Sequence, residues 1–130
     1  MDRAAGRILV VDDEPPLLRM MSLFLGRLGY SVTVAESTEQ AWSLAKAEPE
    51  AFVAALLDGS MKGMSMEDLA LRLLRANPSL RVLAASGYPV DMTDLSAAAP
   101  GRVAFLLKPF TPEMLAAAVR RLLAAQEEDL

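Results

Sequence analysis

Four charged residues follow apolar segments of this chain, and they are the side chains with the clearest chemical potential. Asp12 and Asp13 follow the first of these segments, Asp58 follows the second and Lys108 follows the third. Charged groups are costly to bury unless they meet each other, a metal ion or a phosphate. Their placement therefore indicates a built site rather than scattered surface charge.

The chemistry of such a site is narrowed by what the chain lacks. Three clustered carboxylates would repel each other by about 4 kcal/mol per pair at ~4 Å and an effective dielectric near 20, and a divalent cation removes that repulsion. The chain has no Cys and no His, which excludes thiolate, imidazole and zinc-finger chemistry and leaves oxygen ligands that suit Mg²⁺, Mn²⁺ or Ca²⁺. The hydroxyl of Ser86 and the ammonium of Lys108 suit the oxygens of a phosphoryl group. The set predicts metal-assisted phosphoryl transfer.

The elements that must position these residues alternate along the chain. Apolar segments predict five strands, at residues 7–11, 30–35, 52–57, 80–84 and 102–107. Helices are predicted between and after them; Ser37, Ser65 and Thr111 precede three of these as N-caps. The alanine-rich segment 90–99 has the weakest helical pattern.

This alternation, with strands too apolar to have a wet face, predicts a doubly wound α/β fold with a five-stranded parallel sheet and five flanking helices. We assume the flavodoxin-like strand order 2-1-3-4-5, in which ligands bind at the carboxyl ends of strands 1 and 3. Asp12, Asp13 and Asp58 would then meet at that edge.

Composition limits the remaining classes of function. A net charge of -4 and a pI near 4.8 give no basic surface for nucleic acid. Apolar runs are shorter than the ~20 residues that span a bilayer, and no signal peptide is recognisable. We expect a single cytoplasmic domain over residues 1–130, with a core at about 7–123 and a short polar tail at 124–130, and no insertion into a membrane.

Four strings in this order resemble the receiver (CheY-like) domains of two-component response regulators. They are the residues 8–15, 56–58 with Met61 three positions on, 86–88 and 105–110. The resemblance covers the chain from about Arg7 to Leu123.

The resemblance implies that Asp58 is the phosphoacceptor, which attacks the phosphohistidine of a sensor histidine kinase or histidine phosphotransfer protein. Mg²⁺, or Mn²⁺ as an alternative ion, would be held by Asp13 and Asp58 directly, by Asp12 largely through water and by the backbone carbonyl of Ser60. The protein would assist its own phosphorylation and dephosphorylation, without being an enzyme for an external substrate.

The resemblance also implies a switch. Ser86 and Lys108 would bind phosphoryl oxygens, and Lys108-Pro109 would be a cis peptide. Ser86 would move toward the phosphoryl group and Phe105 would move inward. The surface of helix 4, strand 5 and helix 5 would change for an unknown downstream protein. A monomer, or a weak phosphorylation-dependent dimer, is expected.

The loop after Asp58 departs from the family pattern. Gly59 stands where a larger residue is common, Lys62 where proline is usual and Met66 where glycine is frequent. We expect a looser loop, an effect of Lys62 on phosphate lifetime, and shielding of the phosphoryl group by Tyr88.

Two alternatives stay open. A degenerate receiver would bind partners without phosphorylation, and the altered loop favours it. A small phosphohydrolase of the haloacid-dehalogenase type would also use an aspartyl nucleophile and Mg²⁺, but Ser60 stands where that family has a second Asp and the chain is too short for a cap domain.

Overall fold

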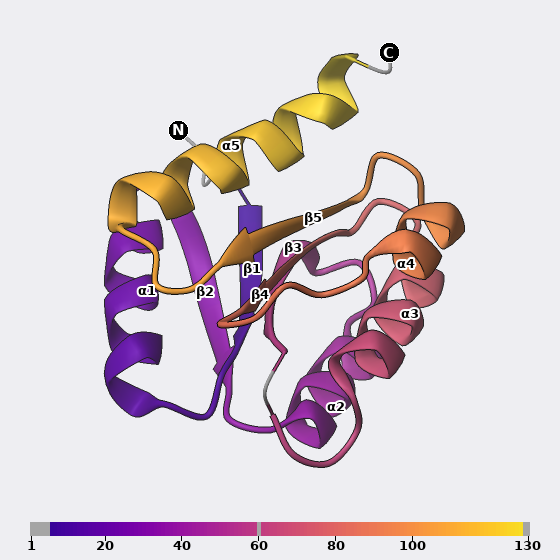
Figure 1. The fold of residues 1–130 in the computed structure, drawn as a ribbon, viewed down its shortest axis with the longest axis horizontal. Helices are drawn as coiled ribbons and strands as arrows, with labels where there is room; N and C mark the ends of the chain where they lie inside the picture. Colours follow the sequence, from indigo (N-terminus) through magenta and orange to yellow (C-terminus); the bar gives the residue numbers. More distant parts are fainter. Residues whose placement is uncertain (1–5, 60, 129–130) are drawn as a thin grey trace.

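The computed structural model describes residues 6–59 and 61–128, which form a five-stranded parallel sheet between two layers of helices (Figure 1). The strands are β1 (Gly6–Val11), β2 (Tyr30–Ala35), β3 (Phe52–Asp58), β4 (Arg81–Ser86) and β5 (Val103–Leu107). The helices are α1 (Pro15–Arg27), α2 (Thr38–Ala47), α3 (Met66–Ala76), α4 (Thr93–Ala98) and α5 (Pro112–Glu128). The strand order β2-β1-β3-β4-β5 confirms the assumed topology.

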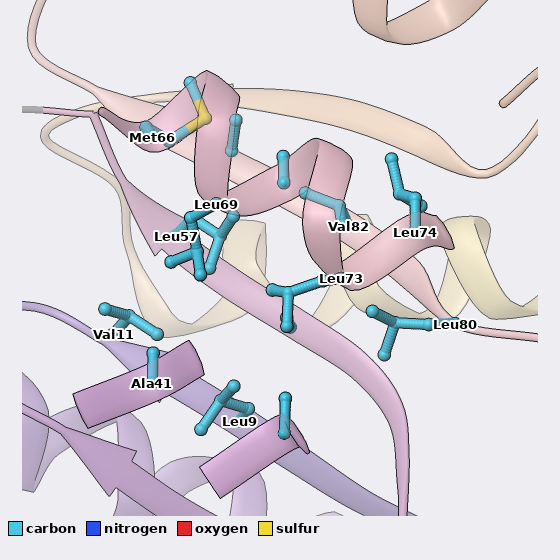
Figure 2. Close-up of a cluster of buried hydrophobic side chains, with 14 of the residues drawn as sticks. Leu9, Val11, Ala41, Leu57, Met66, Leu69, Leu73, Leu74, Leu80 and Val82 are labelled. Carbon is cyan, nitrogen blue, oxygen red and sulfur yellow. The ribbon is translucent and has the colours of Figure 1, made fainter. Parts of the chain in front are cut away.

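The sheet separates two hydrophobic clusters. On one face, α1 and α5 pack on Ile8 and Val10 of β1; on the other, α2, α3 and α4 pack on Leu9 and Val11. Figure 2 shows the second cluster, where side chains of α3 point toward the strands. Because β1 alternates apolar residues into both clusters, it is buried on both faces, as expected for a central parallel strand. Polar chemistry is therefore confined to its ends.

Local capping starts three helices as predicted. The side-chain oxygens of Ser37, Ser65 and Thr111 each accept a hydrogen bond from the backbone N–H three residues later, at 3.0, 3.1 and 3.1 Å. These bonds satisfy donors that a helix N-terminus leaves without intrahelical partners. The caps fix where α2, α3 and α5 begin relative to the strands before them.

The predicted boundaries differ from the structure near the site. β4 reaches Ser86, two residues beyond the predicted strand, and Lys108 N–H donates to the Ser86 carbonyl at 2.8 Å. Pairing with β5 thus holds Ser86 in the sheet. The sequence did not indicate this, because Gly87 directly after Ser86 is typical of a turn. α4 is shorter than predicted; Met92 at its N-cap supplies no side-chain hydrogen bond, while Asp91 Oδ1 accepts from Thr93 N–H at 2.9 Å. Within the described ranges, no helix combines the length and the apolar character required to cross a membrane.

Candidate functional site

The carboxyl ends of β1 and β3 bring three carboxylates together. One oxygen each from Asp12, Asp13 and Asp58 can be chosen so that all lie within 4.8 Å of one another. Asp12 is 1% exposed and Asp58 is 5% exposed, whereas Asp13 is exposed. The cluster has two buried members and one that faces solvent, an arrangement open to an ion from one side.

Backbone contacts fix the first acidic residue. Asp12 N–H donates to the Ala35 carbonyl of β2 at 3.2 Å, so the residue remains attached to the sheet. Its Oδ1 accepts from Glu14 N–H at 3.0 Å, just before Pro15 begins α1. This turn leaves Oδ2 of Asp12 directed at the cluster, where it meets a lysine.

That lysine is Lys108, which follows β5. Its Nζ lies 3.2 Å from Asp12 Oδ2 and 3.2 Å from Asp58 Oδ1, and 3.9 Å from Glu14 Oε1. The Lys108–Pro109 peptide bond is cis. The ammonium therefore joins the ends of β1 and β3 from a strand two places away from β3 in the sheet.

Burial and neighbouring charges shift the pKa values of Asp12 and Lys108. Burial is the largest influence on Asp12 and raises its pKa; the charge of Asp58 adds to this, and the Glu14 N–H and Lys108 only partly oppose it. Burial works against the Lys108 ammonium, but its hydrogen bond to Asp58 and the charges of both aspartates outweigh burial and raise the pKa of Lys108. The site thus stabilises positive charge and penalises further negative charge.

Ser86 lies at the same edge. It is 5% exposed, and its Oγ accepts from Tyr88 N–H at 3.2 Å. A Cβ added to Gly59 would lie 3.3 Å from Ser86 Cβ, and Gly59 N–H donates to the Ala85 carbonyl at 2.7 Å. Glycine after the phosphoacceptor candidate therefore lets the backbone approach Ser86 closely.

The other residues singled out in the sequence lie around this centre. Phe105 is half-buried against the cluster that contains α3 and α4, away from the carboxylates. Tyr88 is 78% exposed and lines an open groove of about 540 Å³ together with Lys108. Lys62 is exposed and makes no ion pair with any residue of the described ranges. Ser60 lies outside the described residues.

Two carboxylates in this region were missed by sequence reasoning. Glu14 approaches Lys108, and Glu39 of α2 contacts the loop after β3. Glu14 lies in the first string quoted above, so its nearness to Asp12 and Asp13 was a usable signal. Glu39 offered none, because its contact partner is 25 residues away.

The donor set fits a hard divalent cation. Three carboxylates offer oxygen ligands, and two of them, Asp12 and Asp58, are buried close together, so that a bound cation would offset their repulsion. Asp12, Asp13 and Asp58 are the described residues that could hold the ion. Such an ion supplies charge neutralisation to the oxygens of a transferred phosphoryl group.

The family model of the response regulator receiver domain matches residues 8–120. The chain belongs to this family. Receiver domains are the phosphoacceptor modules of two-component systems, and this assignment agrees with the observed sheet order and with an acidic pocket at its edge.

Curated relatives carry receiver domains within longer chains. The alginate biosynthesis transcriptional regulatory protein AlgB of Pseudomonas aeruginosa is 31% identical over 122 residues, which are 94% of this chain and 27% of AlgB. The DNA-binding response regulator MtrA of Mycolicibacterium smegmatis is 30% identical over 129 residues, 99% of this chain and 55% of MtrA. The chain thus spans about half or less of these relatives.

Solved structures agree in fold. A CheY-like receiver domain protein from Methanospirillum hungatei superposes with a TM-score of 0.80 at 29% identity, covering 96% of this chain and 98% of that one. Response regulator TrrA from Thermotoga maritima, solved with Mg²⁺ and BeF, superposes with a TM-score of 0.74 at 29% identity, covering 91% and 99%.

Proposed function

We propose that this receiver domain accepts a phosphoryl group on Asp58 in a histidine-to-aspartate phosphorelay. The observation that carries the proposal is the buried Asp58 carboxylate, grouped with Asp12 and Asp13 and 3.2 Å from Lys108. A nucleophile, an oxygen-ligand metal site and a phosphate-binding cation are thereby within reach of one transferred group.

The proposed reaction is a displacement at phosphorus. A carboxylate oxygen of Asp58 attacks the phosphorus of a phosphohistidine on a sensor kinase or phosphotransfer protein, the N–P bond breaks, and the imidazole leaves with the bonding pair and takes up a proton. Lys108 is placed to follow the negative charge onto the phosphoryl oxygens, and Ser86 to donate its hydroxyl proton to another. Mg²⁺, or Mn²⁺ in its place, would be held by the three aspartates and by the Ser60 carbonyl.

The output surface is proposed to be that of α4, β5 and α5. Leu107 of β5 and Met114 of α5 are 48% and 45% exposed, and Phe105 of β5 is half-buried against the hydrophobic cluster that includes Leu95 of α4. Movement of Ser86 and Phe105 would shift the protein between two conformations of this surface, and a protein partner would bind one of them more tightly. A single cytoplasmic domain that is monomeric or forms a weak dimer stays a prediction.

The test is phosphorylation of the purified protein with Mg²⁺ and acetyl phosphate. We expect an added mass of roughly 80 Da, the mass of one phosphoryl unit, together with saturable binding of beryllofluoride. Asp58→Asn should abolish both, whereas Asp94→Asn, which changes an exposed carboxylate on α4, should preserve both.

Three results would contradict the proposal. An unchanged adduct in Asp58→Asn would place the acceptor elsewhere. A wild-type protein that takes up neither Mg²⁺ nor beryllofluoride would favour the degenerate receiver, whose altered loop after Asp58 is the feature that supports it. Steady turnover of a phosphomonoester would favour the hydrolase.

A further inference from the structure

The loop between β3 and α3 is held by a carboxylate from another helix. Glu39, in the first turn of α2, accepts a hydrogen bond at its Oε2 from Met64 N–H at 3.1 Å. Figure 1 shows this loop passing the start of α2. The bond links two residues that are 25 positions apart in the chain.

Glu39 is itself held in place. Thr38, which is 1% exposed, donates from Oγ1 to Glu39 Oε1 at 3.2 Å. The Met64 N–H is the largest influence on the carboxyl and, with further hydrogen bonds from Thr38 and from the Glu39 backbone, lowers the pKa of Glu39. The side chain is therefore an ionised acceptor at neutral pH, with its second oxygen occupied.

Gly63 packs closely against the Glu39 carboxylate. Its φ is +89°, a conformation that favours glycine, and a Cβ at this position would lie 2.7 Å from Glu39 Oε2 and 2.9 Å from Oε1. Any side chain at residue 63 would displace the carboxylate. The loop and Glu39 thus fit each other at two points, one polar and one steric.

The same loop begins directly after Asp58, the candidate phosphoacceptor at the end of β3. Among the described residues, Gly59 N–H donates to the Ala85 carbonyl at 2.7 Å at the start of the loop, and Met64 N–H donates to Glu39 at 3.1 Å near its end. Only residues 60–63 lie between these points, and they include Ser60, the proposed carbonyl ligand. Glu39 contacts the loop at Gly63 and Met64, directly after Lys62.

We propose that Glu39 is a positioning residue for the phosphoacceptor site, acting through the Met64 N–H to hold the loop in the geometry that receives Mg²⁺ and the phosphoryl group. The proposal rests on the proposed function. Glu39 acts on the site through the backbone, so its loss lowers affinity by releasing loop freedom that binding must then remove.

The first test compares Glu39→Ala with Glu39→Gln and Glu36→Ala. Titration calorimetry gives the affinity for beryllofluoride at saturating Mg²⁺, acetyl phosphate gives the phosphorylation rate, and urea unfolding gives stability. Losing the bond should weaken beryllofluoride binding by about threefold to tenfold. Glu39→Gln keeps an oxygen acceptor and should restore affinity to within about twofold. Glu36→Ala removes an exposed carboxylate with no described side-chain contact and should change nothing.

The second test is a double-mutant cycle with Gly63→Ala. The added methyl group should weaken beryllofluoride binding in wild type, but less in the Glu39→Ala background, because the clash with the carboxylate is gone and only the φ strain remains. Non-additive losses support the proposal. Should Glu39→Ala fail to fold, Glu39→Gln and Gly63→Ala carry the comparison.

The outcomes distinguish failure of the proposed phosphoacceptor function from failure of the role proposed for Glu39. A wild-type protein that does not respond to Mg²⁺ and beryllofluoride overturns the proposed function and this inference with it. A responsive wild type with Glu39→Ala equal to Glu36→Ala, or with strictly additive losses in the cycle, overturns this inference alone. A loss of stability in Glu39→Ala without any loss of affinity also overturns it.

Discussion

Lys108→Met is the change most directly tied to the geometry of the site. Methionine retains much of the apolar stem but removes the ammonium that lies 3.2 Å from both Asp12 and Asp58. In the absence of Mg²⁺, Lys108 is a cation that contacts both of these carboxylates. Its loss leaves two buried carboxylates facing each other.

The magnitude follows from the distances. Each attraction of Lys108 at 3.2 Å is about 5 kcal/mol at an effective dielectric of 20. The repulsion of two carboxylates within 4.8 Å is at least about 3.5 kcal/mol on the same scale. Desolvation of the ammonium, and protonation of a carboxylate in the variant, offset much of the loss. We expect a net decrease of about 2–4 kcal/mol in the free energy of unfolding without Mg²⁺.

Saturating Mg²⁺ should reduce this decrease to below about 1 kcal/mol, because the ion neutralises the same carboxylates. By linkage, Mg²⁺ should bind Lys108→Met about tenfold or more tightly than wild type. Beryllofluoride should nevertheless bind the variant more weakly, because its fluorides lose a cation. The two affinities therefore change in opposite directions.

Urea unfolding followed by circular dichroism, with chelator and with Mg²⁺, measures the first effect, and calorimetry measures the two affinities. Lys46→Met, at an exposed lysine on α2, is the matched control and should leave all three values near wild type. Equal destabilisation of Lys108→Met with and without Mg²⁺ would show that Lys108 acts by packing. Unchanged Mg²⁺ affinity would refute competition for the carboxylates.

Three further changes have defined outcomes. Asp12→Asn should stabilise the Mg²⁺-free protein at neutral pH. The pKa of Asp12 is raised in the folded protein, so its carboxylate lowers the free energy of unfolding as pH rises from the ordinary Asp pKa through the raised one. Urea unfolding of the variant and wild type at pH 4 and pH 7 should therefore show the gain only at pH 7. Arg102→Met removes hydrogen bonds to the carbonyls of Leu74, Asn77 and Leu80, in the last turn of α3 and the connection to β4. The change should lower the free energy of unfolding by about 2 kcal/mol, against less than about 0.5 kcal/mol for Arg121→Met. Leu69→Ala, at a fully buried side chain, should cost about 3 kcal/mol in urea unfolding with the midpoint lowered and the m-value unchanged.

Local pattern was enough to predict the strands and most helix starts. Apolar segments mark buried strands because a parallel sheet hides both faces, and Ser37 and Ser65 mark helix starts because their hydroxyls satisfy free N–H groups nearby. The weakest prediction was at residues 90–99, where alanine has high helix propensity but supplies no cap or apolar stripe. There the helix is limited to Thr93–Ala98.

In the candidate site too, local pattern predicted some features and long-range packing decided others. Residue type and position after a strand singled out Asp58, Asp13 and Lys108, because a charged group next to a buried apolar strand is costly unless it meets an opposite charge, a metal ion or a phosphate. The sequence could not show that Lys108 contacts Asp12, 96 residues earlier, because that contact depends on strand order. The sequence likewise could not show the hydrogen bond between Glu39 and the loop after β3.

The sequence by itself determined the chemical groups and the edge of the sheet at which they would emerge. The tertiary structure decided which groups meet: one ammonium spans two carboxylates, and Glu39 fits against Gly63. The physical reason is that the two kinds of interaction act over different distances along the chain and in space. Propensity, capping and burial patterns act over a few residues, whereas ion pairs and steric fit act over a few ångströms between segments that only the packed sheet brings together.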